Sequence, residues 1–146
     1  MKTLWNEAHR AEVLQRLGRI TPKVTPTWGK MDAARMVAHL GDWFRMALGE
    51  LPIAERNLPV RYFPLKQLLI FVLPFPKNLP TAPELQRQAV SLDEELALLR
   101  SGVERFVARD VNERWSVHPA FGPLSGSTWG ALAHKHMDHH LRQFGL

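Results

Sequence analysis

The chain has 146 residues, the length of one ordinary domain, and no cysteine, which excludes disulfides and thiolate metal ligands. Its formal charge is +5, but lysine and arginine are scattered along the sequence, which favours a solvated basic surface over a nucleic-acid-binding one. The most apolar run, residues 68–75, is too short to cross a bilayer, which needs about 20 residues, and residues 1–10 lack the apolar core of a signal peptide. We therefore expect one domain over residues 1–146, a cytoplasmic location, and no nucleic-acid or membrane partner.

Apolar residues recur at spacings of three and four along four segments of the sequence. This pattern predicts amphipathic helices at residues 3–20, 31–48, 91–109 and 127–146. The expected fold class is therefore all-α, a four-helix bundle with a core along the apolar stripes.

Polar residues indicate how the predicted helices begin and which of their faces meet solvent. Ser127 or Thr128 is expected to cap the start of the last helix. Three acidic residues of the third helix are expected to face solvent: Glu94, Glu95 and Glu104.

Residues 51–90 form the least regular part of the chain and hold seven of its eleven prolines. A short helix is expected between Pro64 and Leu73, with proline in its first turn. A connection of this length allows two neighbouring helices of a bundle to run parallel. Long ordered loops also often form a wall of a functional pocket, so a passive crossover and a crossover that lines a pocket are both open.

Two histidines of the last predicted helix lie one turn apart on its apolar face. His136 and His140 have the i,i+4 spacing at which two imidazoles can bind one metal ion. His39 lies on the apolar face of the second predicted helix, so the three imidazoles converge if the two helices pack side by side. Three neutral imidazoles suit Zn, Ni, Fe or Cu. The alternative is that all three histidines lie in the core or at the surface and bind no metal.

Further motifs surround these histidines in the sequence. They are Trp28-Gly29-Lys30-Met31, Pro74-Phe75-Pro76-Lys77-Asn78 followed by Pro80-Thr81, His118-Pro119-Ala120-Phe121-Gly122, and the ending HHLRQFGL. Together with His39 and the segment HMDHH at residues 136–140, this pattern resembles the DinB-like superfamily of metal-binding four-helix bundles, in a branch of unknown function. Arg142 lies one place later than the commonest arginine of that superfamily.

The resemblance implies a metal-dependent thiol transferase or isomerase that uses a low-molecular-weight thiol and acts on a small electrophile. The implied metal is Zn or Ni. Its implied ligands are His39, His136 and His140. Five other residues are expected to orient a ligand or to line the pocket: His139, Gln143, Trp43, Trp129 and His118. His118 has a second interpretation, in which it only fixes its loop by a hydrogen bond.

Two other classes of function stay open from the sequence. A hydrolase would use the same metal to activate water instead of a thiol. A structural bundle, such as a homodimer, would have no turnover, and its site would be vestigial or serve stability. A nucleic-acid-binding function has the least support, because no groove-reading motif accompanies the basic charge.

Overall fold

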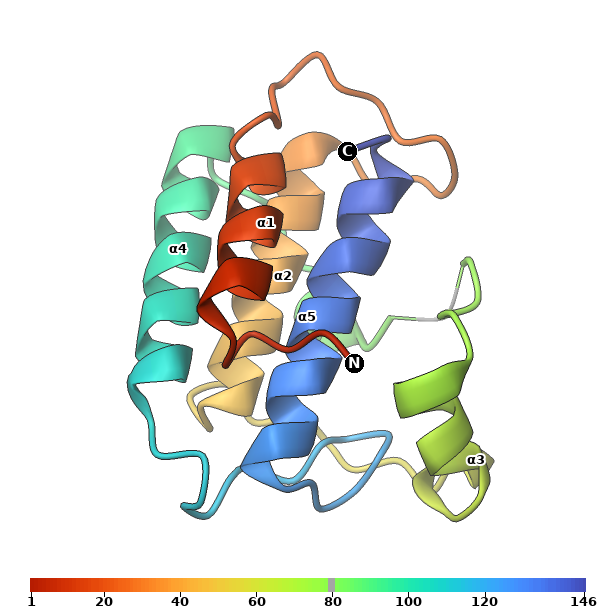
Figure 1. Cartoon of the computed structure of the whole chain (residues 1–146). Coiled ribbons are helices and arrows are strands. Elements are labelled where there is room, and N and C mark those ends of the chain that lie inside the picture. Colours follow the sequence, from red (N-terminus) through yellow and green to blue (C-terminus); the bar gives the residue numbers. More distant parts are fainter. Residues whose placement is uncertain (79–80) are drawn as a thin grey trace.

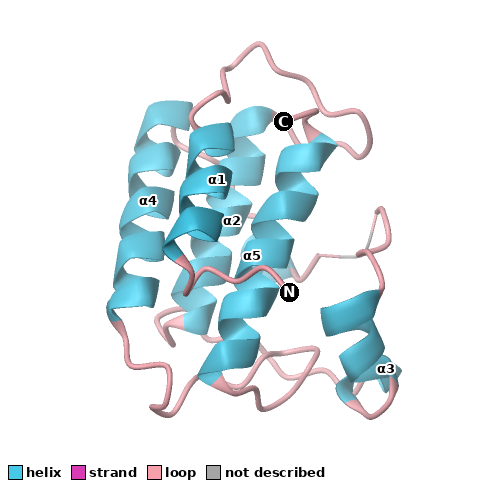
Figure 2. Ribbon diagram, in the orientation of Figure 1, coloured by secondary structure: helices cyan, strands magenta, loops and turns pink. Residues whose placement is uncertain are grey.

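The structure, a computed structural model, describes residues 1–78 and 81–146, and this described part contains five α-helices and no strand. Four long helices lie side by side: α1 (Glu7–Leu17), α2 (Ala33–Ala47), α4 (Leu92–Ala108) and α5 (Gly126–Gln143) (Figure 1). The short helix α3 (Leu65–Gln67) lies apart from them (Figure 2). The predicted all-α bundle is therefore confirmed. Pro80, quoted in one of the sequence motifs, is outside the described residues.

The long helices run in two parallel pairs, α1 with α5 and α2 with α4 (Figure 1). Near the start of the first pair, the Leu4 N–H donates to the Gly130 carbonyl at 3.1 Å. Near its end, the Arg16 guanidinium pairs with Asp138 at 2.7 Å. In the second pair, Arg105 late in α4 forms an ion pair with Glu50, just after α2. Because α2 and α4 are parallel neighbours, the chain between them must return along the whole bundle, which explains the long crossover.

The helix starts differ from the sequence prediction in two places. Helix α1 begins four residues later than expected, because the Asn6 side chain accepts the His9 N–H and caps it there. The residues before Asn6 are not helical, and the Trp5 indole lies against α5 close to Gly130. Helix α5 is capped by Ser125, which accepts the Thr128 N–H, so the expected cap at Ser127 or Thr128 was wrong by two to three residues.

The core fills the space between the four long helices with apolar side chains from all of them. Its largest fully buried side chains are Trp129, Phe44, Phe106, Leu4, Leu17, Met36, Leu40, Ile70, Leu99, Leu132, Met137 and Leu141. Ile70 comes from the crossover, so that segment is anchored in the same core. No helix in the described ranges has both the length and the apolar character needed to cross a membrane.

The crossover contains the short helix that the sequence predicts between Pro64 and Leu73. Helix α3 continues into a π-helical turn, η2 (Leu68–Val72), and single turns η1 (Pro59–Arg61) and η3 (Pro83–Leu85) lie on either side. The Lys135 ammonium of α5 donates to the carbonyls of Leu69, Ile70 and Leu73. These carbonyls lie at the C-terminal end of η2, where a cation satisfies groups that have no helical partner.

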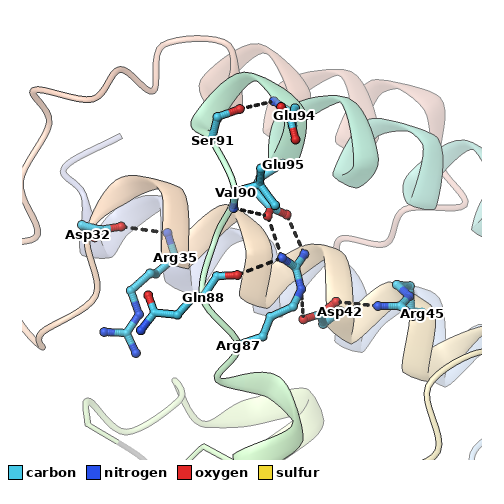
Figure 3. Close-up of polar contacts among 10 residues, drawn as sticks. All are labelled: Asp32, Arg35, Asp42, Arg45, Arg87, Gln88, Val90, Ser91, Glu94 and Glu95. Atoms are coloured by element: carbon cyan, nitrogen blue, oxygen red, sulfur yellow. Dashed lines mark hydrogen bonds and ion pairs between the residues drawn. The ribbon is translucent and has the colours of Figure 1, made fainter.

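A buried ion cluster fastens the end of the crossover to α2 and α4 (Figure 3). The Arg87 guanidinium donates to both Glu95 oxygens at 2.6 Å and to the Asp42 carboxylate at 2.8 Å. Glu95 also accepts the Val90 N–H at 3.1 Å. Glu95 is only 1% exposed, so its expected solvent-facing position was wrong. The sequence shows no partner for it within its own helix, because Arg87 lies eight residues earlier, in the irregular crossover.

Candidate metal centre

Three imidazoles from two helices meet at one point beside the core. His39 comes from α2, and His136 and His140 come from adjacent turns of α5. The Nε2 atom of His136 lies 3.1 Å from Nε2 of His39 and 3.0 Å from Nε2 of His140. One nitrogen from each ring lies within 4.8 Å of the other two. The predicted convergence of the three histidines is therefore confirmed, and this buried group could hold a metal ion.

The far nitrogens of two of these rings have hydrogen-bond acceptors that fix the tautomer. His39 Nδ1 lies 3.3 Å from the carbonyl oxygen of Leu85, which can only accept, so Nδ1 carries the proton. His140 Nδ1 lies 2.8 Å from Oε1 of Gln143. The Gln143 amide group is oriented by its own NH₂, which donates to the Trp28 carbonyl at 2.8 Å. His140 Nδ1 is therefore also a donor, and in both rings Nε2 is left with a free lone pair.

With these tautomers, at most one of the three Nε2 atoms carries a proton. His136 can donate one N–H at most, yet its Nε2 lies close to two nitrogens that both present lone pairs. A cation between the three nitrogens would remove the lone-pair repulsion. Zinc bonds to imidazole at 2.0–2.1 Å, so a tetrahedral site places its nitrogens about 3.3 Å apart. Two of the three spacings in the structure, 3.0 and 3.1 Å, are close to that value, and all three are within 4.8 Å.

The environment keeps the three rings neutral, as metal ligands must be. Burial lowers the pKa of His140 to about 3, and it also lowers the pKa of His39. The pKa of His136 is well below its ordinary value, first because of burial and then because of the neighbouring rings of His140 and His39. At neutral pH, protons therefore compete weakly for these nitrogens.

A cavity of about 850 Å³ opens onto the three imidazoles. One wall comes from α2 and α5, and the facing wall comes from the crossover, which contributes Leu58, Val60, Leu69, Phe75 and Leu85. Of the two alternatives for the crossover, the structure therefore confirms the one in which it lines a pocket. A cavity of this size and largely apolar lining is typical of small-molecule sites.

The remaining predicted site residues have different positions around this cavity. Trp43 lines it, with its ring centroid 5.2 Å from that of His136. His139 also lines it, between Trp28 and Phe75, but the His139 ring makes no hydrogen bond to another described residue. Of the two candidates, only Gln143 therefore orients a ligand histidine.

His118 satisfies both of its predicted interpretations. Its Nδ1 accepts the N–H groups of Ala120 and Phe121, which fixes the loop before α5, and its ring also lines the cavity. Burial lowers the pKa of His118 to about 3.

Trp129 does not line the cavity, so its predicted pocket role was wrong. The side chain is 0% exposed, its ring lies behind Trp43 at a centroid distance of 5.3 Å, and its indole N–H donates to the Ser116 carbonyl. Trp129 lies seven residues before His136 in α5, two turns closer to the helix start. At that level the loop after α4 covers the helix, so the indole becomes part of the core.

Sequence reasoning missed the backbone groups that complete the site. The carbonyls of Leu85 and Trp28 have no side-chain signature, since any residue supplies one. Gly29 does leave a signal: it has φ +80°, and a Cβ atom there would lie 2.6 Å from the Gln143 amide nitrogen. A glycine in this loop is therefore needed both for the turn and for the close approach of Gln143.

A comparison with known protein families gives a match to a family without an assigned activity. Residues 75–145 match the model of a family described as "Protein of unknown function (DUF1569)". The match spans just under half of the chain and contains His136 and His140 but not His39. Searches of curated proteins and of solved structures each found no match. The chain is thus similar over α4 and α5 to an uncharacterised family.

Proposed function

We propose that this protein is a metal-dependent enzyme that transfers a low-molecular-weight thiol to a small electrophile, with Zn or Ni held by His39, His136 and His140. The observation that carries the proposal is the convergence of three neutral Nε2 atoms at the edge of a cavity large enough for a substrate. The resemblance of the sequence to the DinB-like superfamily supports the same chemistry.

The residues present fit a divalent transition metal. Three imidazoles leave at least one coordination position free, which is the arrangement of catalytic rather than structural sites. The acceptors at Leu85 and Gln143 hold the rings of His39 and His140 in the correct tautomer, a support that ligand histidines commonly have. A bound metal would supply Lewis-acid activation, either of a thiol or of water.

The charges around the cavity favour a thiol over water. Hydrolysis with a metal usually needs a carboxylate or another base to accept a proton. The described lining of the cavity has no aspartate or glutamate, and burial lowers the pKa of both histidines outside the ligand set, to about 3 for His118 and below its ordinary value for His139, so both are weak bases at neutral pH. In a thiol transfer, the sulfur bonds to an electrophilic carbon, the leaving group departs with its electron pair, and the thiol proton passes to water. This reaction needs no carboxylate.

Metal content tests the first part of the proposal. We would measure it by mass spectrometry on untagged wild type, His136→Ala and His9→Ala, the last being a half-buried histidine of α1 outside the cavity. Near one metal per chain is expected for wild type and His9→Ala, with loss in His136→Ala. Absence of metal in wild type after incubation with Zn or Ni would refute the site.

Turnover tests the second part. Metal-loaded protein would be assayed with glutathione and two electrophiles, the uncharged 1-chloro-2,4-dinitrobenzene and the anionic 2-chloro-3,5-dinitrobenzoate, and separately with a panel of esters and lactones without thiol. Thiol-dependent turnover that is absent in His136→Ala supports the proposal. Hydrolysis without thiol would replace it with the hydrolase, and a metal-loaded protein that converts neither group of substrates would favour a structural bundle.

A further inference from the structure

The charged side chains in the described lining of the cavity are all positive. Its described lining includes Lys30, Arg35 and Arg56 but no aspartate or glutamate. None of these three cations takes part in a salt bridge among residues 1–78 and 81–146, although eight other lysine and arginine side chains do. A divalent ion held by three neutral imidazoles would add to this positive charge, since its ligands do not neutralise it.

Arg35 lies one helical turn before His39, on the face of α2 that lines the cavity. Its side chain is half-buried and extends away from the carboxylates of Asp42 and Glu95, which form ion pairs with Arg87 (Figure 3). The acid closest to it in sequence, Asp32, accepts the backbone N–H of Arg35 at 2.8 Å as the helix cap. The guanidinium therefore has five donors and no carboxylate partner among the described residues.

Arg56 reaches the same cavity from the crossover. It is half-buried, and its backbone N–H donates to the Pro119 carbonyl at 2.8 Å, which ties this part of the crossover to the loop that carries His118. Arg56 is thus held in place by its backbone while its guanidinium has no ion-pair partner within the described residues. A guanidinium without an ion-pair partner can bind carboxylate, phosphate or sulfonate groups with two parallel hydrogen bonds.

The rest of the lining suits an apolar molecule. Aromatic and aliphatic side chains contribute most of the surface, among them Trp28, Met31, Trp43, Leu69, Phe75 and Phe121. We propose that the cavity binds an organic anion with an apolar body, whose acidic group is held by Arg35 and Arg56 while the body lies against these side chains. The proposal specifies that the electrophile of the proposed function is negatively charged. It rests on that function for the role of the metal.

A matched pair of dyes tests the proposal without turnover. 1-Anilinonaphthalene-8-sulfonate and N-phenyl-1-naphthylamine share their rings, and only the first carries a negative charge. Both would be titrated by fluorescence into metal-loaded and metal-free protein, with calorimetry for stoichiometry. We expect one sulfonate dye per chain, bound about tenfold or more tightly than the neutral dye, which is the value of one charge-assisted contact.

Two variants and one control variant test whether Arg35 and Arg56 bind the sulfonate group. Arg35→Gln and Arg56→Gln should each lower the affinity for the sulfonate dye by about tenfold and leave the affinity for the neutral dye within about twofold of wild type. Arg114→Gln removes the same charge from an exposed residue outside the cavity and should change neither affinity. Circular dichroism of each variant would show that the fold is retained.

The outcomes separate this inference from the proposed function. Equal affinity for the two dyes, or equal effects of Arg114→Gln and the two cavity variants, would overturn the anion site even in a protein with a full complement of metal. Arginine-dependent binding of the sulfonate dye in a protein that takes up no metal would uphold the anion site and refute the metal enzyme. Arginine-dependent binding that tightens with metal supports both.

Discussion

Replacing Arg87 should destabilise the protein strongly, because Arg87 is the guanidinium that joins two buried carboxylates. The side chains of Asp42 and Glu95 are 1% and 0% exposed, and Arg87 contacts them at 2.6–2.8 Å. Removing one partner of a buried ion pair costs about 3–5 kcal/mol, since the remaining charge cannot be solvated. For Arg87→Met we expect a loss of that size in the free energy of unfolding, measured by urea denaturation, and a midpoint lower by roughly 10–16 °C on heating.

Arg45→Met provides the matched control. Arg45 also pairs with Asp42, at 3.1 Å, but its side chain is 46% exposed. An exposed ion pair contributes less than about 1 kcal/mol, so this variant should be close to wild type. If Arg45→Met and Arg87→Met lose the same stability, the burial of the cluster does not determine its energy and the reasoning is wrong.

The pH dependence of the loss provides an independent check. The Arg87 guanidinium lowers the pKa of Glu95 below its ordinary 4.5, so this ion pair stabilises the fold above pH 4.5 and loses its effect as the carboxyl is protonated at lower pH. The stability difference between wild type and Arg87→Met should therefore be widest near pH 7 and become smaller below pH 4.5. A difference that does not change with pH would refute an electrostatic origin.

Three further predictions concern the metal site and its histidines. Gln143→Leu removes the acceptor for His140 and should weaken Zn binding by about 10–100-fold in a competition assay with a chromogenic chelator; an unchanged affinity would show that Gln143 does not orient the ring. Gly29→Ala should give a similar loss of affinity although it lies outside the ligand set, because the new Cβ would displace the Gln143 amide group; wild-type affinity would contradict this. In metal-free protein, His118 and His140 have a folded pKa of about 3 against an ordinary 6.5, so protons bind the unfolded chain first as the pH falls below 6.5 and stability decreases. Between pH 7 and pH 5 the urea-derived free energy of unfolding should fall by about 2 kcal/mol for each such histidine, and a constant value would exclude buried neutral rings.

The sequence predicted the parts of this structure that depend on periodic side chains. The four long helices and the convergence of His39, His136 and His140 follow from apolar spacing, since a helix face that packs inward brings its histidines with it. Trp129 shows the limit of this reasoning: it shares the apolar face of α5 with His136, yet the loop after α4 buries it. A position on the apolar face of a helix predicts that the side chain is buried, but not which neighbouring segment covers it.

Contacts that join irregular segments to helices were beyond the sequence. Glu95 belongs to a polar stretch of α4 that reads as solvent-exposed, and only the path of the crossover brings Arg87 onto it. The Leu85 carbonyl has no side-chain signal at all, and its position depends on the same path. Both contacts depend on the path of the proline-rich crossover. The sequence of this segment has no periodic apolar pattern from which its path could be predicted.

The crossover therefore links the stability of the bundle to the chemistry of the cavity. On α2, His39 points to the cavity and Asp42, less than one turn later, points to the Arg87 cluster. Leu85 and Arg87 contact these two residues from positions only two apart in the chain, so the ion cluster that fastens the crossover also positions the carbonyl that orients His39. Arg87 in this cluster and Arg45, which pairs with Asp42, together neutralise the two buried acids beside the site. Within the described residues, the cavity is then left with three cations outside any salt bridge and with neutral imidazoles, a charge balance that favours the anionic ligand proposed above.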